Sequence, residues 1–382
     1  MPSAQASVME TLRLTDLSEH PRNAGLAGYA AIGAWRRTAY LGLIAGREIL
    51  TALPRDVARA LTRALRSRSA APLRIDTGVR ADAGATRIAL YVHYSATGLI
   101  SQMVRYQLEV LNQLGFSVVF ISMASHIPEA DWDAVRQRAA VVVQRPNFGL
   151  DFGAWRDLLP EVQRRWSVPG ELLLANDSVL GPIHPLKPVI DAMRAGGDGL
   201  FGLTESLQNG PHLQSYMLMA RGVPAVADLM CFMQKLHISH SKWLLVRMGE
   251  VRLSRWMRRR GHRVAALFGY DRLVRAAVAD PEERRRLQAV YPRLQDLSEM
   301  STGAAIATLH RWPLNPTHHF WRVLTTQFSY PFLKTELIQR NPARLPAVTE
   351  WQTLVPADSP CPLSVIEAHL ATLEAPSGTD PR

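Results

Sequence analysis

Between residues 87 and 175 the sequence alternates short apolar runs with segments of helical periodicity. Runs rich in β-branched and aromatic residues predict strands at 87–94, 117–123, 140–144 and 171–175. Periodic segments between them predict helices at 100–114, 129–138 and 152–166. Strands joined by helices require crossover connections, which produce a mostly parallel sheet flanked by helices. The predicted fold class is therefore α/β and Rossmann-like, with ligands expected beyond the carboxyl ends of the strands.

Composition limits the classes of protein to which this chain can belong. Its 382 residues, 47% of them hydrophobic and 20% charged, can bury a core and do not resemble a disordered polyelectrolyte. Two cysteines, Cys231 and Cys361, cannot supply a disulfide framework, which favours a reducing, cytoplasmic location. The first 20 residues are polar and mixed in charge, unlike a signal peptide.

The net charge of +11 is concentrated in two segments of the chain. Residues 1–80 contain 12 arginines and 6 acids, and residues 241–300 contain 14 basic and 7 acidic side chains. This asymmetry predicts contact with an anionic partner. Nucleic acid is not the expected partner, because no helix-turn-helix, RNA-binding or zinc-finger signature is present. The arginines between Arg255 and Arg263 fit a phosphate group, on a donor, a lipid-linked acceptor or a lipid, and equally a solvated helix face.

The N-terminal segment contains an apolar stretch at 25–45 with Arg36 and Arg37 at its centre, too costly for a membrane-spanning helix. One interpretation is an amphipathic helix on an anionic inner-membrane surface, with Trp35 and Tyr40 at the interface and Arg47 facing headgroups. The other is a helix packed on the protein itself. The predicted organisation lists five parts: a basic helical segment 1–65, a linker 66–85, a main domain 86–300, a helical part 301–345 and a tail 346–382.

Polar residues follow the third and fourth predicted strands. The third strand leads into Asn147, Gly149 and Asp151, which offer polar groups and close backbone approach to a ligand. The fourth leads into three polar residues, Asn176, Asp177 and Ser178. A carboxylate at this point is suited to hold a divalent cation on a diphosphate, so Asp177 is the candidate ligand of Mg²⁺ or Mn²⁺. Each motif alone is typical of an ordinary loop; at consecutive strand ends they indicate a ligand site.

A set of motifs in this order resembles the rhamnan synthesis protein F family: NFGLDFGAWRDLL, LLLANDSVLGPI, GLTES, HLQSYMLMA, NPTHHFWRVL and PFLKTELIQRNP. Proteins of that family are implicated in building rhamnose-rich cell-surface polysaccharides. The resemblance covers about residues 86–345. It implies a glycosyltransferase that moves a sugar, with rhamnose as a candidate, from a nucleotide sugar such as dTDP-rhamnose to a lipid-linked or growing polysaccharide.

The chain also resembles, more distantly, inverting glycosyltransferases of the GT-A fold. Those enzymes carry an Asn-x-Gly loop, a strand ending in an acidic motif, and an acidic pair before a helix that ends in glycine. This likeness implies a donor pocket lined by Asn147, Gly149, Asp151, Asn176, Asp177 and Ser178. It also implies that Glu250 is the general base, before a helix ending at Gly261. A single carboxylate in the acidic motif leaves metal dependence open, and Gly249 replaces one member of the acidic pair.

Two site assignments and one functional alternative stay open. Glu205, after a predicted strand at 199–203, is a second candidate for the base that deprotonates the acceptor hydroxyl. His212, Gln214 and Tyr216 alternate along a predicted strand, as acceptor-binding residues or as a cross-strand surface ladder. The alternative function is a non-catalytic basic scaffold at the membrane of a polysaccharide-assembly complex. These motifs do not determine which sugar, nucleotide or linkage is involved, and they leave the oligomeric state open.

Overall fold

The structure is a computed structural model that describes residues 12–18, 42–43, 45–47, 49–55, 57–58, 72–239, 241–290 and 294–374. Most of the predicted amphipathic segment 25–45, with Trp35, Arg36, Arg37 and Tyr40, lies outside these residues. Where the chain is described between 42 and 58, it is helical. In the described ranges, no helix combines the length and the hydropathy that a bilayer crossing requires.

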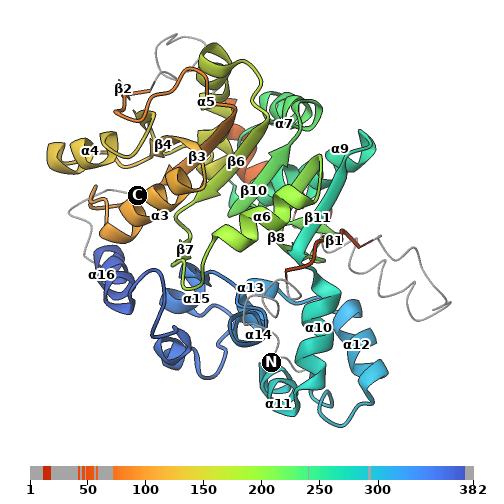
Figure 1. Cartoon of the computed structure of the whole chain (residues 1–382). Helices are drawn as coiled ribbons and strands as arrows, with labels where there is room; N and C mark the ends of the chain where they lie inside the picture. The colour runs from red at the N-terminus through yellow and green to blue at the C-terminus, as the bar shows by residue number, and fades with distance from the viewer. Residues whose placement is uncertain are drawn as a thin grey trace.

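One mixed sheet organises the molecule (Figure 1). The described strands follow the order β1-β11-β8-β10-β6-β3-β4-β5-β2, with β9 beside β8. Their bounds are β1 Thr15–Asp16, β2 Arg74–Thr77, β3 Arg87–His93, β4 Ser117–Ser122, β5 Val141–Gln144, β6 Glu171–Asn176, β8 Gly199–Ser206, β9 His212–Leu213, β10 Met217–Arg221 and β11 Arg263–Phe268. Strands β3, β4, β5, β6, β8 and β11 run parallel, whereas β1, β2 and β10 are antiparallel to their neighbours. The α/β class with a mostly parallel core is confirmed.

Helices cover both faces of the sheet because successive strand residues point to opposite sides. Tyr91 and Phe120 belong to one core, with α3 (Gln102–Gln113), α4 (Glu129–Arg136), α6 (Lys187–Ala195) and α10 (Tyr270–Ala279). Leu90 and Ile121 belong to the other, with α5 (Leu150–Trp166), α7 (Val223–Lys235), α8 (Lys242–Val246) and α9 (Arg252–Arg259). Burial on both faces explains why these strands are continuous apolar runs in the sequence.

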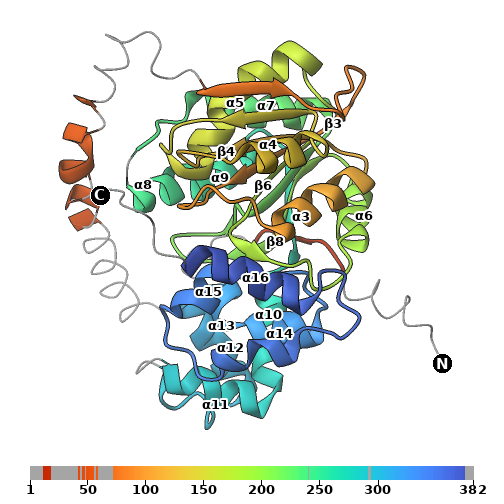
Figure 2. The same ribbon diagram turned by 90° about the vertical axis from the view of Figure 1, so that its left-hand side faces the viewer.

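The C-terminal helices form a lobe at one end of the molecule, below the sheet in both views (Figures 1 and 2). They are α11 Pro281–Val290, α12 Thr302–Arg311, α13 Pro316–His319, α14 Trp321–Gln327, α15 Thr335–Arg340 and α16 Leu363–Glu374. A two-stranded ladder ties the lobe to the main sheet's loops: β12 (Leu333–Lys334) pairs antiparallel with β7 (Val179–Leu180), which follows β6. This pairing brings Lys334 beside the loop that follows β6.

Some predicted boundaries do not hold in the structure. Strand β2 lies inside the segment predicted as a linker at 66–85, and β1 lies inside the basic segment 1–65; both pair with the main sheet. The segment predicted as a tail contains α16 and a 3₁₀ helix at Val348–Leu354. Ile366 and Trp351 pack there against Trp321 in one apolar cluster. Strands β1 and β2 have the sequences TD and RIDT, which form no apolar run, so their assignment required the tertiary structure.

Candidate functional site

Two carboxylates lie at the edge of the sheet where the parallel strands β5 and β6 end. Asp177 directly follows β6, and Asp151 is in the first turn of α5, after the loop that leaves β5. Asn176 Nδ2 donates a hydrogen bond to Asp151 Oδ2 at 2.7 Å. The backbone N–H of Tyr94, after β3, donates to Asp177 Oδ2 at 2.8 Å. The structure thus brings together the two strand-end motifs that the sequence singles out.

Both carboxyl groups have raised pKa values. Burial raises the pKa of Asp151 to about 6, against the opposing influence of Lys334 and the hydrogen bond from Asn176. Burial raises the pKa of Asp177 to about 7, and the charge of Asp151 raises it further, against the hydrogen bond from Tyr94. Two carboxylates that share a poorly solvated site disfavour each other's ionised form. An additional positive charge beside them would therefore be stabilised.

Lys334 provides positive charge at this site, and sequence reasoning missed it. Its Nζ donates to Ser178 Oγ at 2.7 Å and lies 4.9 Å from the centroid of the Tyr216 ring. Burial lowers the pKa of Lys334, while the charges of Asp151 and Glu250 raise it. Two features of the sequence could have pointed to Lys334. Lysine is rare in this chain, at four of the 44 basic residues, and Lys334 lies within the PFLKTELIQRNP motif.

The loop between β5 and α5 is shaped by glycine and held by an arginine. Gly149 has φ +76°, and a Cβ there would lie 2.1 Å from Ile238 Cγ2, so a larger residue does not fit. Arg145 is buried and donates to Asp157 Oδ2 at 2.7 Å, which anchors the loop to α5. Asn147 is exposed at the surface of the loop. Gly149 therefore shapes the site, and Asn147 is a polar residue of this loop that is exposed.

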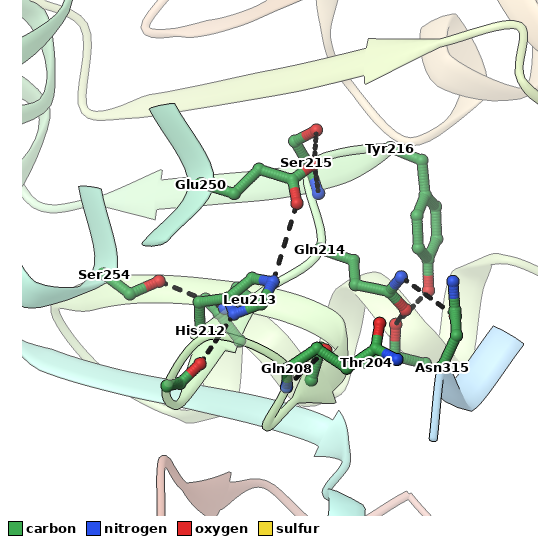
Figure 3. Close-up of polar contacts among 12 residues, drawn as sticks. Thr204, Gln208, His212, Leu213, Gln214, Ser215, Tyr216, Glu250, Ser254 and Asn315 are labelled. Atoms are coloured by element: carbon green, nitrogen blue, oxygen red, sulfur yellow. Dashed lines mark hydrogen bonds and ion pairs between the residues drawn. The ribbon is translucent and has the colours of Figure 1, made fainter. Parts of the chain in front are cut away.

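Glu250 lies in a π-helical turn, Arg247–Val251, between α8 and α9; such turns are frequent at functional sites. Glu250 Oε1 accepts hydrogen bonds from Ser215 Oγ at 2.5 Å and from Ser215 N at 3.3 Å. Glu250 Oε2 lies 3.6 Å from His212 Nε2 (Figure 3). A Cβ at Gly249 would lie 2.8 Å from the ring of Phe152, which explains why no acidic pair fits here.

The residues 212–216 do not form a single strand, so that prediction is wrong. Strand β9 ends at Leu213 and β10 begins at Met217, with a turn between them. Hydrogen bonds from side chains replace the strand ladder here. Thr204 Oγ1 donates to Gln214 Oε1 at 2.7 Å and lies 2.7 Å from the Tyr216 hydroxyl (Figure 3). The turn gathers Gln214 and Tyr216 around Thr204 and aims Ser215 at Glu250.

His212 has a defined tautomer because of its backbone neighbour. Its Nδ1 lies 2.8 Å from the carbonyl oxygen of Gly210, which can only accept, so Nδ1 carries the hydrogen. The Nε2 atom then faces Glu250 and is 3.6 Å from its carboxylate. The side chain is buried. With its hydrogen on Nδ1, the neutral ring has no hydrogen at Nε2 to give to Glu250, so Ser215 is the residue that orients the carboxylate by hydrogen bonding.

Glu205 has a different environment from Glu250. Its side chain is buried, and its Oε1 accepts from the backbone N–H of Ser18 at 2.6 Å. Its Oε2 accepts from the backbone N–H of Tyr270 at 3.1 Å, at the start of α10. Each oxygen satisfies a backbone donor, and negative charge near the first turn stabilises a helix. Of the two candidate bases, this geometry favours Glu250.

The C-terminal lobe adds buried polar groups to the same region. Burial lowers the pKa of His318 to about 4, and the neighbouring Glu336 opposes this effect. Glu336 Oε1 lies 3.7 Å from Lys242 Nζ. Asn315, which precedes α13, accepts from Gln214 Nε2 at 3.4 Å (Figure 3). The NPTHH motif therefore closes one side of the site.

A divalent cation has a limited set of protein ligands here. Among the described residues, no group of three His, Cys, Asp or Glu side chains is placed to hold a metal ion. Mg²⁺, however, is usually held by one or two carboxylates together with substrate phosphates and water. Asp151 and Asp177 fit that smaller donor set, since they lie at neighbouring strand ends and a bound cation would stabilise the ionised forms that burial disfavours.

Comparison with known proteins gives two matches. The sequence model described as "Rhamnan synthesis protein F" matches residues 118–274. This match confirms the family resemblance. The matched residues include Asp151, Asp177 and Glu250, whereas Lys334 lies beyond them. The description of that family names the synthesis of rhamnan, a polysaccharide.

The second match is to the uncharacterized protein y4gN of Sinorhizobium fredii (strain NBRC 101917 / NGR234). The two chains are 26% identical over 195 residues, which make up 50% of this chain and 50% of that protein. The chain therefore spans about half the length of the curated relative that it matches.

Proposed function

We propose that this protein is a glycosyltransferase that moves a sugar from a nucleotide donor, with inversion, onto a lipid-linked or growing cell-surface polysaccharide. Asp151, Asp177 and Glu250 carry the proposal because they lie in one polar site at the carboxyl edge of the sheet. Glu250 is close enough for its charge to raise the pKa of Asp151. One acidic group beside a donor diphosphate and one beside an acceptor form the smallest set that this reaction needs.

The proposed reaction assigns a separate task to each group. Glu250 accepts the proton of the acceptor hydroxyl, whose oxygen attacks the anomeric carbon of the donor sugar. The bond from that carbon to the diphosphate breaks, and its electron pair stays on the phosphate oxygen. Ser215 holds the Glu250 carboxylate in place with hydrogen bonds from its hydroxyl and its backbone N–H. A divalent cation held by Asp151 and Asp177 would, when bound, neutralise part of the diphosphate charge.

A basic cavity supports a phosphate-bearing acceptor. The cavity has a volume of about 340 Å³ and is lined by Pro211, Arg255, Arg258 and Arg259. Pro211 is the neighbour in the chain of His212, whose Nε2 lies 3.6 Å from the Glu250 carboxylate. Guanidinium groups bind phosphate oxygens in a bidentate manner. Of the ligands considered for this arginine run, the diphosphate of a lipid-linked glycan fits this position best.

Docking on an anionic membrane surface is supported by an exposed apolar stripe on the helix that the structure describes between 42 and 58. The apolar side chains exposed there are Leu43, Ile49, Leu50, Leu53 and Val57, with exposed fractions of 74%, 46%, 76%, 49% and 46% respectively. On a helical wheel drawn from the sequence, at 100° per residue, these five positions fall within about one third of the circumference. An apolar stripe next to an arginine-rich segment is typical of helices that lie in a membrane interface.

The docking proposal is tested with substitutions that leave the sheet intact. The triple variant Leu43→Ser, Leu50→Ser, Val57→Ser should bind phosphatidylserine-containing vesicles less tightly than the unmodified protein, by co-sedimentation. The control Leu73→Ser, Val79→Ser changes two residues that are similarly exposed elsewhere. Equal vesicle binding by the triple variant and the unmodified protein would refute docking through this stripe.

The enzymatic proposal is tested with purified protein, a panel of nucleotide sugars and an assay of sugar transfer. One donor should raise the thermal unfolding temperature, because ligand at a hundredfold excess over Kd adds about 2.7 kcal/mol of stability. Glu250→Gln should still bind that donor but transfer about 10²–10⁴-fold more slowly. The matched control Glu205→Gln should retain transfer per folded molecule. Full activity of Glu250→Gln removes its role as base, and no donor binding at all would favour the non-catalytic scaffold.

A further inference from the structure

Lys334 lies beside the acidic motif that follows strand β6. Strand β6 delivers Asp177 and Ser178 to the edge of the sheet, and the Lys334 ammonium is hydrogen bonded to the Ser178 hydroxyl at 2.7 Å. The ladder between β12 and β7 places Lys334 opposite Val179, so the lysine backbone is fixed relative to the acidic motif. The lysine comes from a part of the chain 156 residues further on. Its position therefore depends on the docking of the C-terminal lobe.

Among the described residues, Lys334 differs from the buried cations that form structural ion pairs. Arg145, for example, is 2.7 Å from Asp157. Among the described residues, the ion pairs within 4.0 Å include none for Lys334, although Asp151 and Glu250 are near enough to influence its pKa. An ammonium group has three donor hydrogens, and the Ser178 hydroxyl accounts for one. Two donors remain for a ligand.

The surroundings of Lys334 favour an anionic ligand with several acceptor oxygens. The ring of Tyr216 lies on one side, 4.9 Å from Nζ, and keeps part of the water away. Electrostatic interactions are stronger in such a site than in bulk solvent. Lysine offers a compact charge that approaches a phosphate as a point, whereas arginine offers a wide planar fork. A lysine at this position in a chain with so few lysines is consistent with that requirement.

We propose that Lys334 binds the diphosphate of the nucleotide donor and stabilises it as the leaving group. The inference rests on the proposed glycosyltransferase function and assigns to its donor site a cation supplied by the C-terminal lobe. As the bond between the anomeric carbon and the phosphate oxygen breaks, the electron pair moves onto that oxygen. Lys334 remains protonated and donates hydrogen bonds to the oxygen that becomes negative. The acceptor proton goes to Glu250, so the lysine gains and loses no proton.

The test measures binding of nucleoside diphosphates rather than activity alone. Full-length protein is titrated in a calorimeter with UDP, GDP and dTDP and with the matching nucleosides, in buffer containing EDTA. The variants are Lys334→Met, which keeps the length of the chain without its charge, and Lys334→Arg, which restores a charge. Lys242→Met is the matched control, because Lys242 also carries charge near these carboxylates but is 71% exposed. Circular dichroism melting shows whether each variant is folded.

The expected result distinguishes the contribution of the phosphates to binding from that of the nucleoside. Lys334→Met should lose about 10- to 100-fold in affinity for the preferred nucleoside diphosphate, the usual effect of removing a charged hydrogen bond. Its affinity for the nucleoside should not change. Lys334→Arg should recover part of the loss, and Lys242→Met should change affinity less than threefold.

Three outcomes would overturn the inference. Unchanged diphosphate affinity in Lys334→Met removes the assigned role while leaving the proposed function intact. An equal loss for nucleoside and diphosphate indicates a general distortion of the pocket rather than a phosphate contact. If the unmodified protein binds none of the nucleoside diphosphates, with or without Mg²⁺ or Mn²⁺, then the proposed function fails and this inference fails with it.

Discussion

The two ends of strand β6 carry carboxylates in opposite surroundings. Glu171 begins the strand and lies 2.9 Å from Arg194, 3.5 Å from Arg221 and 3.6 Å from Arg87. Asp177 follows the end of the strand; Lys334 lowers its pKa, but burial and the charge of Asp151 still raise the pKa to about 7. The first end of the strand is thus neutralised by the protein itself. At the other end, the ionised form of Asp177 is only partly compensated, so a cation or a ligand donor can stabilise it.

This difference explains why a single strand can serve stability at one end and chemistry at the other. A buried carboxylate with three guanidinium partners is satisfied and has little to offer a ligand. A carboxylate whose pKa is raised by burial and by a second carboxylate is a common feature of functional sites. The position at the carboxyl ends of parallel strands is also where ligands bind in sheets of this kind.

The largest expected effect is on transfer, from a change at the carboxyl end of β6. Asp177→Asn keeps the shape of the side chain and its contact with Tyr94 but removes the charge. Sugar transfer should fall by about 10²–10³-fold, as it does when one electrostatic contact to a transition state is lost. The assay is transfer per folded molecule with the preferred donor. Transfer at the unmodified rate would show that the two ends of β6 do not differ in function.

An intermediate effect, on stability, is expected from the opposite end. Glu171→Gln leaves Arg194 and its neighbours without their countercharge, so the free energy of unfolding should fall by about 1–3 kcal/mol. That loss corresponds to a lower melting temperature, by about 2–4 °C per kcal/mol in proteins of moderate size. Transfer per folded molecule should stay the same. If Glu171→Gln melted at the normal temperature but transferred sugar poorly, then Glu171 would serve activity rather than stability, contrary to this comparison.

The smallest expected effect is a pH dependence of stability at the carboxyl end of the neighbouring strand β3. Burial lowers the pKa of His93 to about 3 and that of His369 to about 4. A folded-state pKa below the unfolded value of about 6.5 means that the stabilisation is complete above pH 6.5 and is lost progressively as the pH falls toward 4. Replacing His369 by Gln should flatten this part of the curve of melting temperature against pH. An identical curve for the variant would show that His369 does not titrate as its burial requires.

Much of the core could be predicted from the sequence because local patterns determine it. The strands around Leu90, Phe120 and Leu173 are short apolar runs, and the helices between them have a clear period. The predicted strand exits, with Asp151 and Asp177, come together because parallel strands end at the same edge. The predicted strand over 212–216 is wrong because hydrogen bonds to Glu250 and Thr204 favour a turn over a ladder.

Other parts of the site depend on contacts between distant segments. In the sequence, Glu250 is the first candidate base and Glu205 the second, and the backbone donors of Ser18 and Tyr270 to Glu205 become visible only in the structure. The edge strands β1 and β2 form no apolar run in the sequence. Their assignment depends on partners more than 60 residues away in the sequence, such as Val143 for Ile75.

By itself, the sequence determined the α/β class, the parallel core and the strand-end carboxylates, since each depends on residues close together in the chain. The tertiary structure alone decided that Lys334 joins Asp151 and Asp177. It did so by pairing β12 with β7 across about 150 residues of chain. The physical reason is that a charge on a distant segment reaches a site only when tertiary packing brings that segment to the site. Such packing leaves no periodic pattern in the local sequence.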